Sequence, residues 1–294
     1  QAGLSSVSST LPDFLIERKD ASGPQIAVYL DGFQFHASPQ HNRIAGDASK
    51  RAEVRAHGRL VWNLTWGDVE QFHRAVTAQP SSAPPDRALL SPEARTAAQR
   101  IQHHRGGAYD VGVIEQNPMA LLLDFLWRPD LAEWQRVVLS AIGGMAAAAG
   151  AAPLDAGALA AQLDAAQAGR WVDTGEPTGP VVALAARAHT PGGLPLGLFL
   201  DATDPDAERW TALAVLDDAP EVCDTAEHRA RWADWLPWAN LLQLLGGPES
   251  ERAGVVAAAS QHDSLDREDL WLRHRVTDAT ATATSGGSPP PTGE

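Results

Sequence analysis

Two aspartates and a histidine near the N-terminus have side chains of the types that metal-dependent hydrolysis of a phosphodiester requires. Asp13 opens one apolar run, Asp31 closes the next, and His36 follows five residues later. Carboxylate oxygens are the ligands that Mg²⁺ prefers, and a bound Mg²⁺ polarises phosphate and activates water. We therefore expect Asp13 and Asp31 to bind Mg²⁺, with His36 as general base or phosphate ligand.

Two predicted strands position these aspartates. Residues 11–18 alternate enough to form a strand, and residues 26–30 are a continuous apolar run typical of a buried one. The segment between them contains Asp, Ser, Gly and Pro, which predicts a short turn and hence a hairpin. The start of the first strand then lies beside the end of the second, which brings Asp13 and Asp31 together. Gly32 allows the chain to turn closely past them.

A helix and a third strand follow the loop that contains His36. Asp47 is suited to be the N-cap or a first-turn acid of a helix that runs to about residue 56, and Gly58 provides its end. Residues 60–66 predict a strand, and a further helix begins behind Asp68. Strand, helix and strand in this order favour a parallel pair in a mixed sheet. Lys50 and Arg51, on the first of these helices, are expected to hold a DNA backbone.

The charge is distributed unevenly along the chain. The 294 residues carry a net charge of -14, with 23 basic and 37 acidic side chains. Residues 1–78 contain eight of each, so the remaining chain carries 15 basic and 29 acidic residues, a balance of -14. The first segment is thus compatible with a phosphate backbone, whereas the rest repels one. A single cysteine excludes an internal disulfide and a cysteine-rich zinc site.

The composition also divides the chain. Residues 79–93 are rich in proline and serine and predict a linker between a domain at 1–78 and an acidic α+β region at 94–276. In that region we expect helices at 94–105 and 119–145, an alanine-rich continuation to about 169, a hairpin and a third strand, and an amphipathic helix pair with tryptophans. Residues 277–294 are of low complexity and are expected to be disordered. No segment predicts a membrane span or a signal peptide, so a cytoplasmic location is expected.

The N-terminal quarter resembles a known nuclease family. Residues 11–75 are similar to the very-short-patch-repair endonucleases and related members of the PD-(D/E)XK superfamily. Pro12 and Asp13 match the first half of that motif, and the segment from Gly32 through Phe35 to His36 matches a glycine-aromatic-histidine segment of the family. The helix expected after His36 adds three further matches, at Asp47, Arg51 and Gly58. The resemblance implies a restriction-endonuclease-like mixed sheet with flanking helices, an α/β fold, and a Mg²⁺-dependent cleavage of DNA.

Two departures from the family pattern leave a second function open. Tyr29 stands where many relatives have an acid, and Asp31 stands where the motif has a lysine. The alternative is a non-catalytic DNA- or protein-binding module with a degenerate nuclease fold, in which the tryptophan-rich acidic region docks a partner.

A weaker resemblance concerns the acidic region. Residues 197–246 are similar to the C-terminal end of large bacterial DEAD/DEAH-box helicases, some of which carry a restriction-like nuclease module. Neither a phosphate-binding G-x-x-x-x-G-K-[ST] loop nor a D-E-A-D/H run occurs in the chain. We therefore expect this chain to be the C-terminal part of a helicase that acts in DNA repair or phage defence, with the motor domains missing from it.

Overall fold

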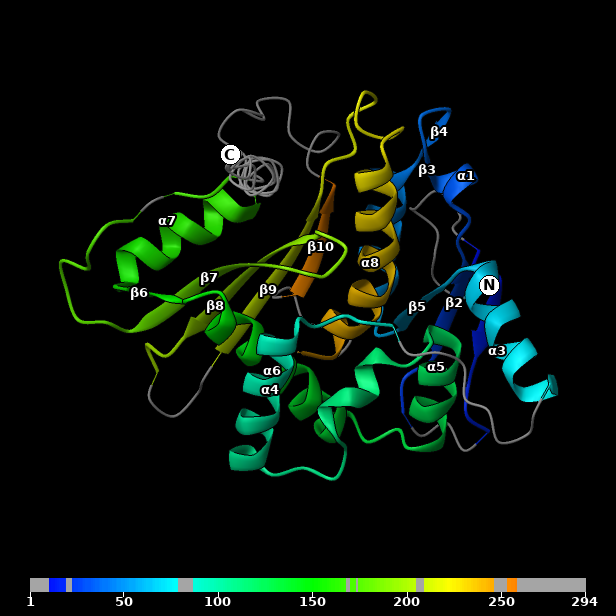
Figure 1. The fold of residues 1–294 in the computed structure, drawn as a ribbon, viewed down its shortest axis with the longest axis horizontal. Coiled ribbons are helices and arrows are strands. Elements are labelled where there is room, and N and C mark those ends of the chain that lie inside the picture. The colour runs from blue at the N-terminus through cyan, green and yellow to red at the C-terminus, as the bar shows by residue number, and fades with distance from the viewer. Residues whose placement is uncertain are drawn as a thin grey trace, which may run out of the picture.

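The computed structural model describes residues 11–19, 23–78, 87–167, 170–172, 174–204, 209–245 and 253–257 of the chain. Within these ranges the protein is a mixture of helices and strands arranged around two principal sheets (Figure 1). The α/β class expected from the sequence is therefore confirmed. Most of the predicted linker and all of the predicted disordered tail lie outside the described residues.

The N-terminal sheet has three strands in the order β1-β2-β5: β1 (Phe14–Ile16), β2 (Ile26–Leu30) and β5 (Leu60–Leu64). β1 pairs antiparallel with β2, so the predicted hairpin is confirmed. β2 pairs parallel with β5, as expected for a crossover through a helix. The central strand is apolar throughout, and its first four residues are buried because both faces are covered: Ile26 and Val28 lie in the main core, whereas Ala27 and Tyr29 pack with Val54 of the crossover helix.

The crossover between β2 and β5 contains more structure than the sequence predicted. A single-turn helix α1 (Phe33–His36) and a small hairpin of β3 (Ala37–Ser38) and β4 (His41–Asn42) occupy the segment expected to be a loop. Helix α2 (Ile44–Ala56) begins three residues before Asp47, which lies in its first turn. Gly58 ends the crossover in the left-handed region, with φ of 76°. Helix α3 (Trp66–Ala78) follows β5 and buries none of its residues.

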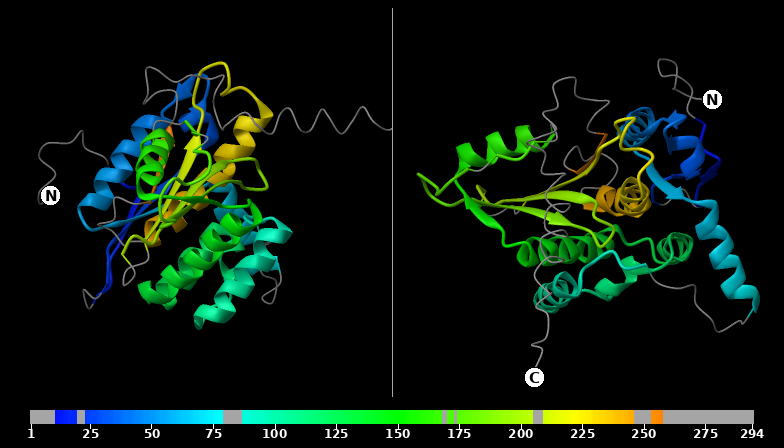
Figure 2. Two further views of the ribbon diagram at one scale, coloured as in Figure 1. Left: turned by 90° about the vertical axis from the view of Figure 1, so that its left-hand side faces the viewer. Right: turned by 45° about the horizontal axis from the view of Figure 1, so that its top comes forward.

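The C-terminal sheet has five strands in the order β10-β9-β8-β7-β6. Its predicted hairpin is formed by β7 (Ala183–His189) and β8 (Pro195–Asp201), and β9 (Arg209–Leu216) lies beside β8 as expected. The outer strands, β6 (Ala152–Leu154) and β10 (Ala253–Ala257), were not predicted. Figure 2 shows α7 (Ala156–Gln167) on one face of this sheet and α6 (Leu131–Ala148) on the other.

The long helix predicted at 119–145 is instead two helices. α5 (Pro118–Trp127) ends before Pro129, and α6 (Leu131–Ala148) begins behind Asp130, whose carboxylate accepts the amides of Ala132 and Glu133. The proline cannot continue the hydrogen bonds of a helix, and Asp130 caps the new one. α4 (Pro92–Arg105) packs along α6. A short 3₁₀ helix, Val111–Glu115, precedes α5.

Helix α8 (Ala226–Leu242) lies between the two sheets and contacts both β5 and β9 (Figure 1). The expected helix pair is thus one helix that continues through Pro237 into a short 3₁₀ turn, Gln243–Leu245. Its three central tryptophans, Trp232, Trp235 and Trp238, are 5%, 1% and 0% exposed. They fill the core, so these three side chains are not a surface on which the acidic region docks a partner, and docking by that region stays a prediction.

One hydrophobic cluster runs through both predicted domains. It joins strands of the N-terminal sheet, represented by Val28 and Trp62, to α6, to β9 and to α8, represented by Trp235. A second, smaller cluster lies between α7 and the opposite face of the C-terminal sheet. The units predicted at 1–78 and 94–276 therefore share a core in the part of the chain that the structure describes.

Candidate functional site

A buried ion pair lies at the end of β2. The carboxylate of Asp31 is 2% exposed, and its Oδ1 is 2.5 Å from a guanidinium nitrogen of Arg51, which is 6% exposed. The end of the strand and the middle of α2 bring these two residues together across the crossover. The same guanidinium lies over the ring of Tyr29, 5.2 Å from its centroid. Tyr29, the departure from the family pattern, thus forms part of the arginine's environment.

A second pair adjoins the first. His36 Nδ1 is 2.7 Å from Asp47 Oδ2, and the same nitrogen is 3.8 Å from Asp31 Oδ1. The last residue of α1 and the first turn of α2 therefore meet at the end of β2. Asp31, His36, Asp47 and Arg51 form one cluster of alternating charge, which we call the Asp31 cluster.

The electrostatics of the cluster are dominated by burial. Burial raises the pKa of Asp31, although the charges of Arg51 and His36 lower it. Burial also acts to raise the pKa of Asp47, but the hydrogen bond from His36 and the charge of Arg51 outweigh it, and the pKa is lowered. Asp47 is thus the more readily ionised of the two carboxyls. The second oxygen of Asp31, Oδ2, is buried and has no hydrogen-bond partner among the residues that the structure describes.

Asp13, the other carboxylate expected to bind Mg²⁺, lies at the start of the first hairpin. Its exposed carboxylate accepts a hydrogen bond from the backbone N–H of Leu30, at 2.8 Å. It therefore extends the pairing between the first two strands by one side-chain bond. The structure places Asp13 on a backbone amide and Asp31 on a guanidinium, so the two carboxylates have separate partners.

The Asp31 cluster in this arrangement does not fit Mg²⁺. Magnesium requires several oxygen ligands in an octahedral arrangement, whereas one oxygen of Asp31 is bound to Arg51 and burial favours protonation of the carboxyl. Among the described residues, no group of three or more His, Cys, Asp or Glu side chains is arranged to hold a metal ion. Magnesium binding by Asp13 and Asp31 stays a prediction, and it requires Arg51 to leave its present position.

The two residues expected to contact a DNA backbone are placed differently. Lys50 is partly exposed, and its charge contributes to the lowered pKa of Asp47, so it lies at the edge of the Asp31 cluster. Arg51 is buried and bonded to Asp31, so it does not reach a phosphate backbone from this position. Exposed side chains near the cluster include Arg43, at the start of α2, and Phe35, which is 66% exposed.

Sequence reasoning missed the partnership of Asp47 and Arg51 with the site. The sequence places both on the helix that follows His36 and predicts a cap or first-turn acid at Asp47 and a phosphate ligand at Arg51. Their spacing of four residues places them on the same face of α2 and was the signal that they act together. The support from the C-terminal half was also missed: Asn42 donates a hydrogen bond to the carbonyl of Asp218, 176 residues further on.

Comparison of the chain with protein-family models, with curated proteins and with solved structures found no match. No helix among the described residues combines the length and apolar character needed to cross a membrane.

Proposed function

We propose that the protein is a non-catalytic DNA-binding module with a degenerate nuclease-like site. The observation that carries this proposal is the buried ion pair between Asp31 and Arg51. In a metal-dependent nuclease a carboxylate at this position must be free to bind a divalent cation. Here the guanidinium supplies the compensating charge from within the fold, which supports a structural role for the pair.

The charge distribution supports DNA as the ligand and the N-terminal segment as its contact. Residues 1–78 have equal numbers of basic and acidic side chains, whereas the rest of the chain carries the whole net charge of -14. Lys50 and Arg43 are the basic side chains beside the Asp31 cluster whose exposure suits contact with phosphate. Lysine and arginine contacts to phosphate position a protein on DNA without reading its sequence.

Salt-dependent binding tests the proposal. Duplex DNA binding by the full chain is measured by fluorescence anisotropy between low and moderate salt, in the presence of Mg²⁺ and of a chelator. We expect equal affinity in both, and a Lys50→Gln variant with a salt slope shallower by about one. Lys19→Gln, which removes the only other lysine, is the matched control and leaves the slope unchanged. Absence of any DNA binding at low salt contradicts the proposal and favours a protein ligand.

A second candidate, a Mg²⁺-dependent endonuclease, is favoured by one observation. Asp31 Oδ2 is buried and finds no hydrogen-bond partner within the described part of the chain, and His36 Nδ1 lies 3.8 Å from the other oxygen of that carboxylate. A cation that displaced Arg51 would find an unoccupied oxygen and a nearby imidazole. Nicking of supercoiled DNA with Mg²⁺ or Mn²⁺, lost in Asp31→Ala and retained in Asp124→Ala, supports this candidate. Equal traces from both variants exclude it.

The assignment to a DEAD/DEAH-box helicase in DNA repair or phage defence is also a proposal. It is supported by the resemblance of residues 197–246 and of residues 11–75. Co-expression with a helicase motor from the same genome, followed by measurement of DNA-stimulated ATP hydrolysis with and without this chain, tests it. A motor whose activity and solubility are unaffected by the chain contradicts it.

A further inference from the structure

His228 is a completely buried histidine that connects the C-terminal half to the segment beside the Asp31 cluster. It lies in the first turn and a half of α8 and is 0% exposed. Its Nδ1 is 3.1 Å from the carbonyl oxygen of Asp217, and its Nε2 is 3.2 Å from the carbonyl oxygen of Ala37. Ala37 directly follows His36. The ring therefore lies between the end of β9 and the segment that carries the histidine of the candidate site.

Both ring nitrogens face hydrogen-bond acceptors. A neutral imidazole has one N–H donor and one acceptor nitrogen, and only the protonated imidazolium has two donors. In the neutral ring one of the two contacts therefore places a nitrogen lone pair against a carbonyl oxygen. Only the imidazolium satisfies both contacts.

We propose that His228 is a proton-dependent positioning residue for the Asp31 cluster: the imidazolium bridges the carbonyls of Ala37 and Asp217, and the neutral ring holds only one. The proton comes from solvent and returns to it. The inference concerns the conformation of the site, while its effect on a ligand rests on the DNA-binding function proposed above.

The groups around the ring are compatible with this role. Burial lowers the pKa of His228, whereas both carbonyls and the carboxylates of Asp217 and Asp218 raise it; the net direction is downward. The ring is thus neutral near neutral pH and gains its second proton in acid. On its other side the ring of Phe33 makes an edge contact, and Arg229 lies over that same phenyl ring. Other charged residues close to it on its helix are Glu227 and, one turn further on, Arg231.

Two further contacts hold the site segment against the C-terminal half, one on α8 and one on the residues that follow β9. Phe33 packs edge-on against Trp232, with centroids 5.4 Å apart, and Asn42 bonds the carbonyl of Asp218. These contacts remain whatever the protonation state of His228. Loss of the hydrogen bond between His228 and the Ala37 carbonyl therefore loosens the backbone at His36 and Ala37 locally, while α1 stays packed against α8.

Nuclear magnetic resonance of the full chain tests the proposal directly. Long-range ¹H–¹⁵N spectra report which ring nitrogens of His228 carry protons, and carbonyl ¹³C shifts report the Ala37 and Asp217 bonds. On acidification from neutral pH we expect the second ring proton to appear below the ordinary histidine pKa. The Ala37 carbonyl or the Asp217 carbonyl, whichever the neutral ring leaves unbonded, shifts with the same midpoint, and the His36 ring resonances follow it.

A conservative variant separates positioning from simple support of the fold. In His228→Gln the side chain retains one donor group without a titratable proton, so the folded variant loses the acid-dependent carbonyl shift, whether it occurs at Ala37 or at Asp217. His73→Gln, on the exposed face of α3, is the control and retains it. If the variant does not fold, the wild-type titration still decides. A His228 ring that titrates while both carbonyls remain unchanged, or that stays neutral until the protein unfolds, overturns the proposal.

The effect of His228 on DNA binding is measured in a separate experiment. If the proposed function is correct, the affinity of the wild type for duplex DNA acquires a step at the His228 midpoint, and His228→Gln lacks that step. Carbonyl shifts without any DNA binding support the positioning role of His228 and contradict the proposed DNA-binding function. DNA binding without the carbonyl shifts does the reverse.

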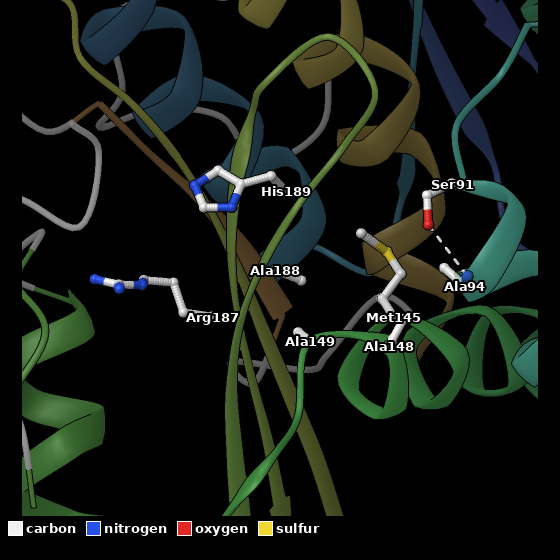
Figure 3. Close-up of a pocket in the computed structure, with 8 residues that line it drawn as sticks. All are labelled: Ser91, Ala94, Met145, Ala148, Ala149, Arg187, Ala188 and His189. Carbon is white, nitrogen blue, oxygen red and sulfur yellow. Dashed lines mark hydrogen bonds between the residues drawn. The ribbon is translucent and has the colours of Figure 1, made fainter. Parts of the chain in front are cut away.

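The structure also contains a cavity away from the Asp31 cluster, which offers fewer reactive side chains than the cluster does. It lies between the start of α4, the end of α6 and β7 (Figure 3). Met145 and Ala188 face it, while the side chains of Arg187 and His189 point to the opposite side of the strand in Figure 3. The lining is mainly apolar and small, which is typical of a packing gap.

Discussion

Asn240 forms two hydrogen bonds with the backbone of Asn63, as a neighbouring strand would. The side chain of Asn240 accepts from the N–H of Asn63 at 2.7 Å and donates to its carbonyl at 2.9 Å. Gln243 makes the same two hydrogen bonds with Val61: its side chain accepts from the N–H at 2.8 Å and donates to the carbonyl at 2.5 Å. Helix α8 and the 3₁₀ turn after it thus supply hydrogen-bond partners to the open edge of β5, whose backbone groups are buried and would otherwise lack them.

Removal of this side-chain pairing should destabilise the protein strongly. In Asn240→Ala, two buried backbone groups of Asn63 lose their partners, which costs about 2–4 kcal/mol of unfolding free energy. Chemical denaturation measures the change. Gln99→Leu, on the exposed face of α4, is the control and changes stability by less than about 0.5 kcal/mol. A loss for Asn240→Ala as small as that of the control contradicts the role assigned to it.

The ion pair between Asp31 and Arg51 predicts a non-additive double mutant. Arg51→Met leaves a buried carboxylate without its counter-charge and should cost about 3–5 kcal/mol. Asp31→Asn removes a carboxyl group whose pKa is already raised by burial. The double variant should recover most of the stability lost in Arg51→Met, because no uncompensated charge remains. Additive effects in the double-mutant cycle show that the two side chains do not interact.

Close approach of α4 and α6 depends on Gly144. A Cβ added there lies 2.4 Å from the carbonyl oxygen of Ala94 and 2.6 Å from the Cβ of Ala98. Gly144→Ala should therefore separate the helices and lower the melting temperature, with a cost of about 1–3 kcal/mol. Gly46→Ala in α2 meets nothing within 4 Å and serves as the control. It should stabilise by about 0.5–1 kcal/mol, because alanine is the better helix former.

Stability should fall in acid because of His228. Its pKa is lower in the folded protein than the unfolded value of about 6.5, so the unfolded state binds more protons as the pH falls. The contribution of the neutral ring is complete above that value and is lost as the pH falls toward the folded pKa. Unfolding free energies between pH 7 and pH 5 measure the slope, which is shallower in His228→Gln. An equal slope in both proteins contradicts the lowered pKa.

Truncation tests whether the predicted N-terminal domain folds alone. A chain ending at residue 78 removes α8, and with it the partners of Val61 and Asn63 and the packing around Trp62. We expect this fragment to lack a cooperative unfolding transition and to expose Trp62 to solvent, as measured by calorimetry and tryptophan fluorescence. A fragment with a sharp transition shows instead that residues 1–78 are an autonomous domain.

The sequence determined the elements whose signals are local. The apolar run at 26–30, the acid at residue 47 and the glycine at residue 58 each depend on neighbours a few positions away, and they predicted β2, α2 and its end. The same local signals predicted the parallel pairing of β2 with β5 and the hairpin of β7 and β8. They also showed which residues of the N-terminal quarter carry chemically reactive groups.

Tertiary structure decided what those groups contact. Asp31 meets Arg51 because α2 packs beside β2, and Asp13 accepts a hydrogen bond from the Leu30 amide. The pairing of Asn240 with Asn63 spans 177 residues, and that of His228 with Ala37 spans 191. Contacts over such separations arise from the packing of whole elements, which no local sequence pattern encodes. For that reason the sequence indicated the residues of the site, while the fold determined their charge partners, their burial and their support by α8.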